Sequence, residues 1–123
     1  MSLERVGFFR ELRHGDENGP FLREAVRSEA SEDESRMISY LTKAGIIATT
    51  GMMVHDVLDP DRKDVAVLEI ATDGVWAWPT DLPYYLATYH VALPEPFIQH
   101  MRSQGWRMPN LDQNQLIALS ERL

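Results

Sequence analysis

The chain has 123 residues, the length of one ordinary domain, so we expect a single domain over residues 1–123. Hydrophobic residues make up 44% and charged residues 25%, which excludes a disordered or collagen-like chain. The net charge of −7 argues against binding to a nucleic acid, because affinity for a phosphate backbone comes from Lys and Arg.

Cysteine is absent, which excludes a disulfide framework, a thiolate zinc site and a cysteine nucleophile. The sequence has no apolar stretch near the ~18 residues that a membrane span needs. The first residues also lack the basic-then-apolar layout of a signal peptide. We therefore expect a cytoplasmic protein that does not bind membranes.

The first third predicts helices. Residues 15–20 are typical of a turn, and residues 21–27 form a second short helical segment. Ser31 and Glu34 have the spacing of a capping box, which predicts a helix over residues 32–44. Ahead of the turn, four apolar residues have helical spacing and predict a short amphipathic helix: Leu3, Val6, Phe9 and Leu12.

The middle third predicts three strands. A β-branched run over residues 46–50, continuing to residue 55, precedes a turn at residues 59–61. A second strand covers residues 65–71, and a third covers residues 75–78 and ends at a proline. Between them, an Asp-Gly pair predicts a two-residue type I′ turn at residues 73 and 74.

This turn predicts which side chains share a face of the sheet. It places Ala71 opposite Trp76 and Ile70 opposite Ala77. Because both faces are apolar, either helices cover both or one face is left partly bare. The first face carries Leu68, Ile70, Val75 and Ala77, and the second carries Val65, Val67, Glu69, Trp76 and Trp78.

The last third again predicts helices. Thr80 or Asp81 can cap the first of them, residues 93–96 separate it from a second, and Asn110 or Asp112 can begin a third. The fold class expected is therefore α+β, a small antiparallel three-stranded meander flanked by N-terminal and C-terminal helices. The apolar stripes of these helices are Leu82, Tyr85, Leu86 and Tyr89; Phe97, Ile98 and Met101; and Leu116, Leu119 and Leu123.

The candidate binding residues combine carboxylates with two indoles. Residues 45–81 hold seven acidic residues against two basic ones, and this charge would steer a basic partner. Tryptophan is enriched in binding hot spots, although indoles in a small domain are more often core. The candidates are Asp56, Asp59, Asp61, Asp64, Glu69, Trp76 and Trp78.

The same segment supplies potential metal ligands, His55 beside Asp56 and the carboxylates that follow. Their spacing fails the EF-hand pattern after its third position, and Arg62 and Lys63 offset the charge. A solvated acidic turn is the better interpretation, so we expect no metal and no cofactor.

An alternative hypothesis is a small enzyme or ligand-binding domain with a pocket between the sheet and the helix near residues 84–89. His14 and His100 lie in polar segments without an evident partner. The chain has no nucleophile elbow and no glycine-rich phosphate loop, so we assign no catalytic residue and favour a protein that is not an enzyme. The pocket candidates are His55, Tyr84, Tyr85 and His90.

The segment Thr72–Pro79, followed by Tyr84–Tyr85, resembles a family of small uncharacterised bacterial proteins. Their pattern is a Thr-Asp-Gly-x-Trp-x-Trp-Pro hairpin followed by a helix with paired tyrosines. The upstream segment Asp56–Pro60 is also similar, and the resemblance covers roughly residues 38–104. It implies no catalytic residues, and small acidic proteins of this kind are reminiscent of immunity proteins.

These observations predict a non-catalytic acidic binding protein, an immunity-like or antitoxin-like inhibitor of a basic protein. A homodimer is a further possibility, formed by pairing an edge strand at residues 46–50 or 76–78.

Overall fold

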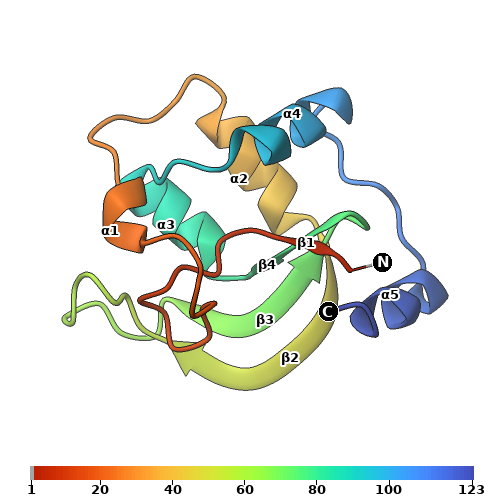
Figure 1. Cartoon of the computed structure of the whole chain (residues 1–123), viewed down its shortest axis with the longest axis horizontal. Helices are drawn as coiled ribbons and strands as arrows, with labels where there is room; N and C mark the ends of the chain where they lie inside the picture. The colour runs from red at the N-terminus through yellow and green to blue at the C-terminus, as the bar shows by residue number, and fades with distance from the viewer. Residues whose placement is uncertain (1) are drawn as a thin grey trace.

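The computed structural model describes residues 2–123, in which a mixed sheet is packed against helices (Figure 1). The strands are β1 (Glu4–Arg5), β2 (Gly45–Val54), β3 (Ala66–Thr72) and β4 (Trp76–Pro79). The helices are α1 (Leu22–Ala25), α2 (Glu34–Thr42), α3 (Leu82–Tyr89), α4 (Glu95–Ser103) and α5 (Gln113–Ser120). The α+β class is confirmed. None of the helices within residues 2–123 has the length and apolar character that a membrane span requires.

The sheet has the strand order β1-β4-β3-β2, so a simple three-stranded meander is wrong. β1 lies parallel to β4, and the amides of Glu4 and Val6 donate to the carbonyls of Val75 and Ala77 at 2.9 and 3.0 Å. The first residues therefore form a strand where an amphipathic helix is expected. This pairing also places β4 inside the sheet, so residues 76–78 are not an edge, whereas β2 is one.

The predicted apolar residues of that N-terminal segment are nevertheless buried. Gly7 has a φ of +82°, a left-handed conformation in which the chain leaves β1 and turns across the sheet. Phe8 and Phe9 are both buried, which a one-sided helix would not allow. Burial here comes from an irregular segment that wraps the core.

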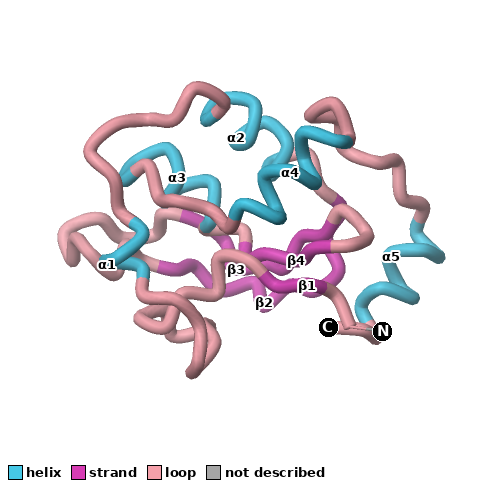
Figure 2. Tube along the Cα trace, turned by 45° about the horizontal axis from the view of Figure 1, so that its top comes forward, coloured by secondary structure: helices cyan, strands magenta, loops and turns pink. Residues whose placement is uncertain are grey.

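Helices α2, α3 and α4 lie together on one side of the sheet, and α5 lies apart from them (Figure 2). The core on the α2–α4 side is aromatic. The ring centroid of Phe97 lies 5.0 Å from that of Trp76 and 5.5 Å from that of Trp78. Trp78 is fully buried, and its indole nitrogen donates to the carbonyl of Leu41 at 3.3 Å. Both indoles therefore belong to the core, and neither forms an exposed binding residue.

On the opposite face, α5 packs over a smaller cluster formed by Leu3, Ala77 and Leu119. α5 approaches the start of β2 closely at Gly45, where an added Cβ would lie 2.6 Å from a methyl group of Leu116. A larger residue at position 45 would therefore displace the Leu116 side chain from its place on the sheet.

The turn between β3 and β4 is longer than the predicted type I′ turn. Thr72 pairs with Ala77, and Ala71 pairs with Trp78. One Asp73 carboxylate oxygen accepts the amides of Val75 and Trp76 at 2.9 and 2.7 Å, so its side chain closes a loop that two residues cannot. The register is shifted by two positions, and an even shift leaves the predicted faces intact.

The predicted capping box at Ser31 and Glu34 is not formed. α2 begins at Glu34 without a side-chain cap, and the Glu34 carboxylate instead lies 2.8 Å from the Nδ1 atom of His90. A capping box is present at α5, where Asp112 and Gln115 exchange bonds of 2.8 Å.

Candidate functional site

Asp56, a predicted surface carboxylate, is buried beneath the loop between β2 and β3. Its side chain accepts hydrogen bonds from the hydroxyls of Tyr84 and Tyr89 at 2.7 and 2.5 Å, and from the amides of Leu58 and Asp59 at 2.7 and 3.1 Å. Burial alone would raise the pKa of Asp56, but these four donors outweigh it and hold the pKa below its usual value. Asp56 fixes the loop to α3 and is not available to a partner.

The rest of this loop, residues 57–65, is called the acidic loop below. Asp61 and Asp64 are exposed, and Asp59 is half-buried beside the Arg62 guanidinium at 3.3 Å. Asp64 has a φ of +54°, and its amide donates to the Nδ1 atom of His55 at 3.3 Å. The acidic loop therefore presents Asp61 and Asp64 to solvent together with the exposed Lys63, while Arg62 partly neutralises Asp59.

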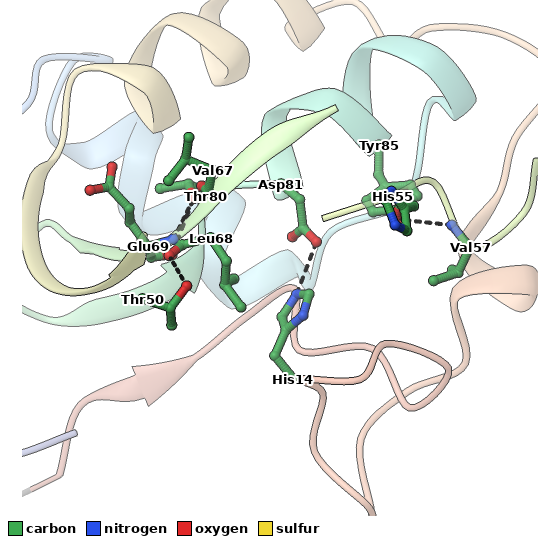
Figure 3. Close-up of polar contacts among 10 residues, drawn as sticks. All are labelled: His14, Thr50, His55, Val57, Val67, Leu68, Glu69, Thr80, Asp81 and Tyr85. Carbon is green, nitrogen blue, oxygen red and sulfur yellow. Dashed lines mark hydrogen bonds and ion pairs between the residues drawn. The ribbon is translucent and has the colours of Figure 1, made fainter. Parts of the chain in front are cut away.

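Next to the acidic loop, the helix-facing side of β2 and β3 is left partly uncovered. Ile46, Met53 and Val67 are 40%, 45% and 43% exposed, which is high for apolar side chains on a sheet. Figure 3 shows Val67 and Glu69 on one side of β3 and Leu68 on the other. We call this surface the bare strip; its residues are Ile46, Thr49, Met53, Val67 and Glu69, which share a face by strand register.

An irregularity in β2 shapes the end of the bare strip. The register shifts between Thr49 and Met53, and Gly51 has a φ of +68°. The Thr50 hydroxyl donates to the carbonyl of Leu68 at 3.0 Å and accepts the amide of Met52 at 3.0 Å. A bulge of this kind re-aims side chains, and here both Met52 and Met53 are exposed.

The two tryptophans do not join the bare strip. Trp78 is fully buried and Trp76 is half-buried against Phe97. Of the predicted carboxylate and indole set, Glu69 lies in the bare strip opposite Thr49, Asp61 and Asp64 lie in the acidic loop, and Asp56 and Trp78 are removed from the surface. The apolar part of this surface comes from Met53, Val67 and Ile46, which are not among the predicted binding residues.

The alternative pocket residues are separated by the structure. Tyr85 is buried, accepts the amide of Val57 at 3.0 Å and donates to the carbonyl of His55 at 3.3 Å (Figure 3). Tyr84 bonds to Asp56, and His90 ends α3 in a left-handed conformation beside Glu34. Tyr84 and Tyr85 therefore anchor the loop, and His90 lies apart beside α2.

His55 instead borders a pocket between the N-terminal segment and the end of β2. Beneath it, the Nε2 atom of His14 lies 2.9 Å from a carboxylate oxygen of Asp81, which is fully buried at the start of α3 (Figure 3). The expectation that His14 and His100 lack a partner is wrong, because His100 also lies 3.1 Å from the buried carboxylate of Asp73. These pairings join segments distant in sequence, so no local pattern indicates them.

Within residues 2–123, no group of three or more His, Asp and Glu side chains is placed to hold a metal ion. Comparison of the chain with protein-family models, curated protein sequences and solved structures finds no match. The family resemblance of residues 38–104 therefore stays a prediction.

Proposed function

We propose that this chain is a non-catalytic binding protein that inhibits a basic protein partner, as immunity proteins and antitoxins do. The observation that carries the proposal is the bare strip, where exposed apolar side chains lie beside the half-buried Glu69 and the sheet continues into the loop that carries the exposed Asp61 and Asp64. An apolar centre with a polar rim is the usual anatomy of a protein–protein interface. Methionine suits such a surface because its flexible side chain adapts to the shape of a partner.

The charge of the region favours a basic partner. The net charge of the chain is −7, and the exposed Asp61 and Asp64 lie in the loop that continues directly from the bare strip. β2 itself carries no charged side chain along its ten residues, so a partner strand or loop meets no like charge there. Carboxylates around such a surface increase the association rate and select against acidic proteins.

The test compares two double variants that change the net charge equally. Asp61→Lys with Glu69→Lys reverses charge at the acidic loop and the bare strip. Glu29→Lys with Glu32→Lys makes the same change at exposed positions between α1 and α2, away from the sheet (Figure 1). Each protein is immobilised at low salt and exposed to a lysate of the source organism.

We expect the wild type and the Glu29/Glu32 control to retain the same basic protein, and the Asp61/Glu69 variant to lose it. Retention should also weaken as salt is raised, because exposed charges are screened. Equal capture by all three proteins, or no basic protein captured by the wild type at low salt, would contradict the proposal.

A further inference from the structure

A second surface feature lies where the N-terminal segment meets the end of β2. It is a pocket with a volume of about 410 Å³, within the range of small-molecule sites. Most of its wall is apolar, and the lining residues with apolar side chains are Leu12, Met52, Met53, Val54, Val57 and Leu68. Leu68 lies on the face of β3 opposite the bare strip, and of the bare-strip residues only Met53 also lines the pocket.

The polar residues that line this pocket are all basic: Arg13, His14 and His55. Arg13 is exposed and makes no ion pair or side-chain hydrogen bond within the part of the chain that the structure describes. His55 accepts the amide of Asp64 on its Nδ1 atom, which leaves its Nε2 atom to carry the proton and act as a donor. In a chain with a net charge of −7, a pocket lined by basic side chains and no acidic ones is unusual.

Two carboxylates lie behind these basic groups. Asp81 is buried under His14, and one of its carboxylate oxygens lies 2.9 Å from the Nε2 atom of that ring at the floor of the pocket. The Asp64 carboxylate lies 3.9 Å from the Nδ1 atom of His55, on the side of that ring away from its free nitrogen. Neither Asp64 nor Asp81 lines the pocket, so Arg13, the His55 Nε2 atom and the His14 Nδ1 atom, which has no hydrogen-bond partner within residues 2–123, remain for a ligand.

Two other surface pockets differ from this one in the charged residues that line them. One is lined by Arg5, but its guanidinium is already paired with Asp16 at 2.9 Å. Another, near α2 and α4, has five acidic residues in its lining. The pocket beside β2 differs because its cationic side chain is not paired.

We propose that the pocket beside β2 binds a small apolar molecule that carries one carboxylate, with the apolar body against Leu12, Met52 and Leu68 and the carboxylate at Arg13 and His55. A charged hydrogen bond from a guanidinium to a carboxylate is stronger than a neutral one. This site shares only Met53 with the bare strip, and its ligand is a free organic acid.

The test uses ligands of equal chain length and different charge. Octanoate, octanol and octylamine are titrated into protein labelled with ¹³C at the methionine methyl groups, and NMR shifts are followed. We expect octanoate to shift the Met52 signal in a saturable way, with weaker binding of octanol and none of octylamine. Met37, a buried residue of α2 outside the pocket, serves as the internal reference.

The variant Arg13→Gln should weaken octanoate binding about tenfold, the order expected for loss of one exposed charged hydrogen bond. His55→Gln should weaken it less, and the matched control Arg107→Gln, an exposed arginine outside the pocket, should bind like the wild type. Vesicles of an anionic phospholipid should not sediment with the protein, which distinguishes a free acid from a membrane lipid.

Equal affinity for octanoate and octanol, an unchanged affinity of the Arg13 variant, or no Met52 shift with any ligand would overturn this proposal. If the protein binds the vesicles and Arg13→Gln abolishes that binding, the ligand is a membrane lipid and the proposal of a free acid is wrong. Failure here leaves the capture experiment unaffected, because Asp61 and Glu69 lie outside the pocket.

Discussion

Asp56 connects the loop after β2 to α3 through four hydrogen bonds, two from phenol hydroxyls and two from backbone amides. The contact with Asp56 also changes the pKa of Tyr89. Burial and the nearby Asp56 carboxylate raise the pKa of Tyr89 well above its ordinary value, so this hydroxyl stays protonated and remains a donor. The residue acts by positioning the acidic loop.

Replacing Asp56 by Asn should lower the free energy of unfolding by about 2 kcal/mol at neutral pH, because a buried charged acceptor with several donors is lost. Since the folded pKa of Asp56 lies below its unfolded value near ~3.9, its contribution is complete above that pH and is lost as the pH falls through the folded pKa. Urea unfolding measured between neutral and acidic pH checks both effects.

The control is Asp61→Asn, an exposed carboxylate at which a change within about 0.5 kcal/mol is expected. An Asp56→Asn protein as stable as the wild type at neutral pH, or one with the wild-type loss of stability in acid, would show that this network does not hold the loop.

At the scale of elements, local signals set the end of α4 and the start of α5, whereas Leu123, expected on the apolar stripe of the last helix, is exposed beyond the end of α5 at Ser120. Gly105 follows the end of α4 and has a φ of +63°, a left-handed conformation that glycine favours at this position. The amide of Trp106 then donates to the carbonyl of Met101 at 3.0 Å. Ser31 carries the same kind of local signal for α2, yet His90 takes the Glu34 carboxylate that a capping box needs. A tertiary contact overrides the local one there.

The two helix starts give a matched pair of variants. Asp112→Ala should destabilise α5 by about 1 kcal/mol, because its side chain accepts the amide of Gln115. Ser31→Ala should have little effect, since α2 has no side-chain cap. Hydrogen exchange of the first-turn amides of each helix is the measurement, and equal effects at both sites would contradict this assignment.

The site was harder to predict than the helices. The faces of β3 were predictable because side chains alternate along a strand, which places Val67 and Glu69 on the same face. The pairing of β3 with β4 is shifted by two positions, and an even shift does not change the faces. The burial of Asp56 could not be predicted, because its partners Tyr84 and Tyr89 lie 28 and 33 positions later in the chain. The pocket beside β2 depends on Arg13 and His14, which a wrongly expected helix would have placed elsewhere.

At the scale of the whole molecule, one small cluster joins the N-terminal strand, the sheet and the last helix. Leu3 is buried against Ala77 and Leu119. Leu3→Ala should lower the free energy of unfolding by about 2 to 3 kcal/mol and reduce the exchange protection of α5. Leu123→Ala, at an exposed leucine, is the control. Unchanged protection of α5 in the Leu3 variant would mean that this helix is held by β2 alone.

The pairing of β1 with β4 has a consequence for biosynthesis. Glu4 leaves the ribosome long before Trp76, its partner, has been translated. Leu3 and Val6 therefore remain unsheltered on the nascent chain until β4 emerges, and a chaperone that recognises short apolar segments has that interval in which to bind them. β1 is thus translated well before β4 and can dock only after it.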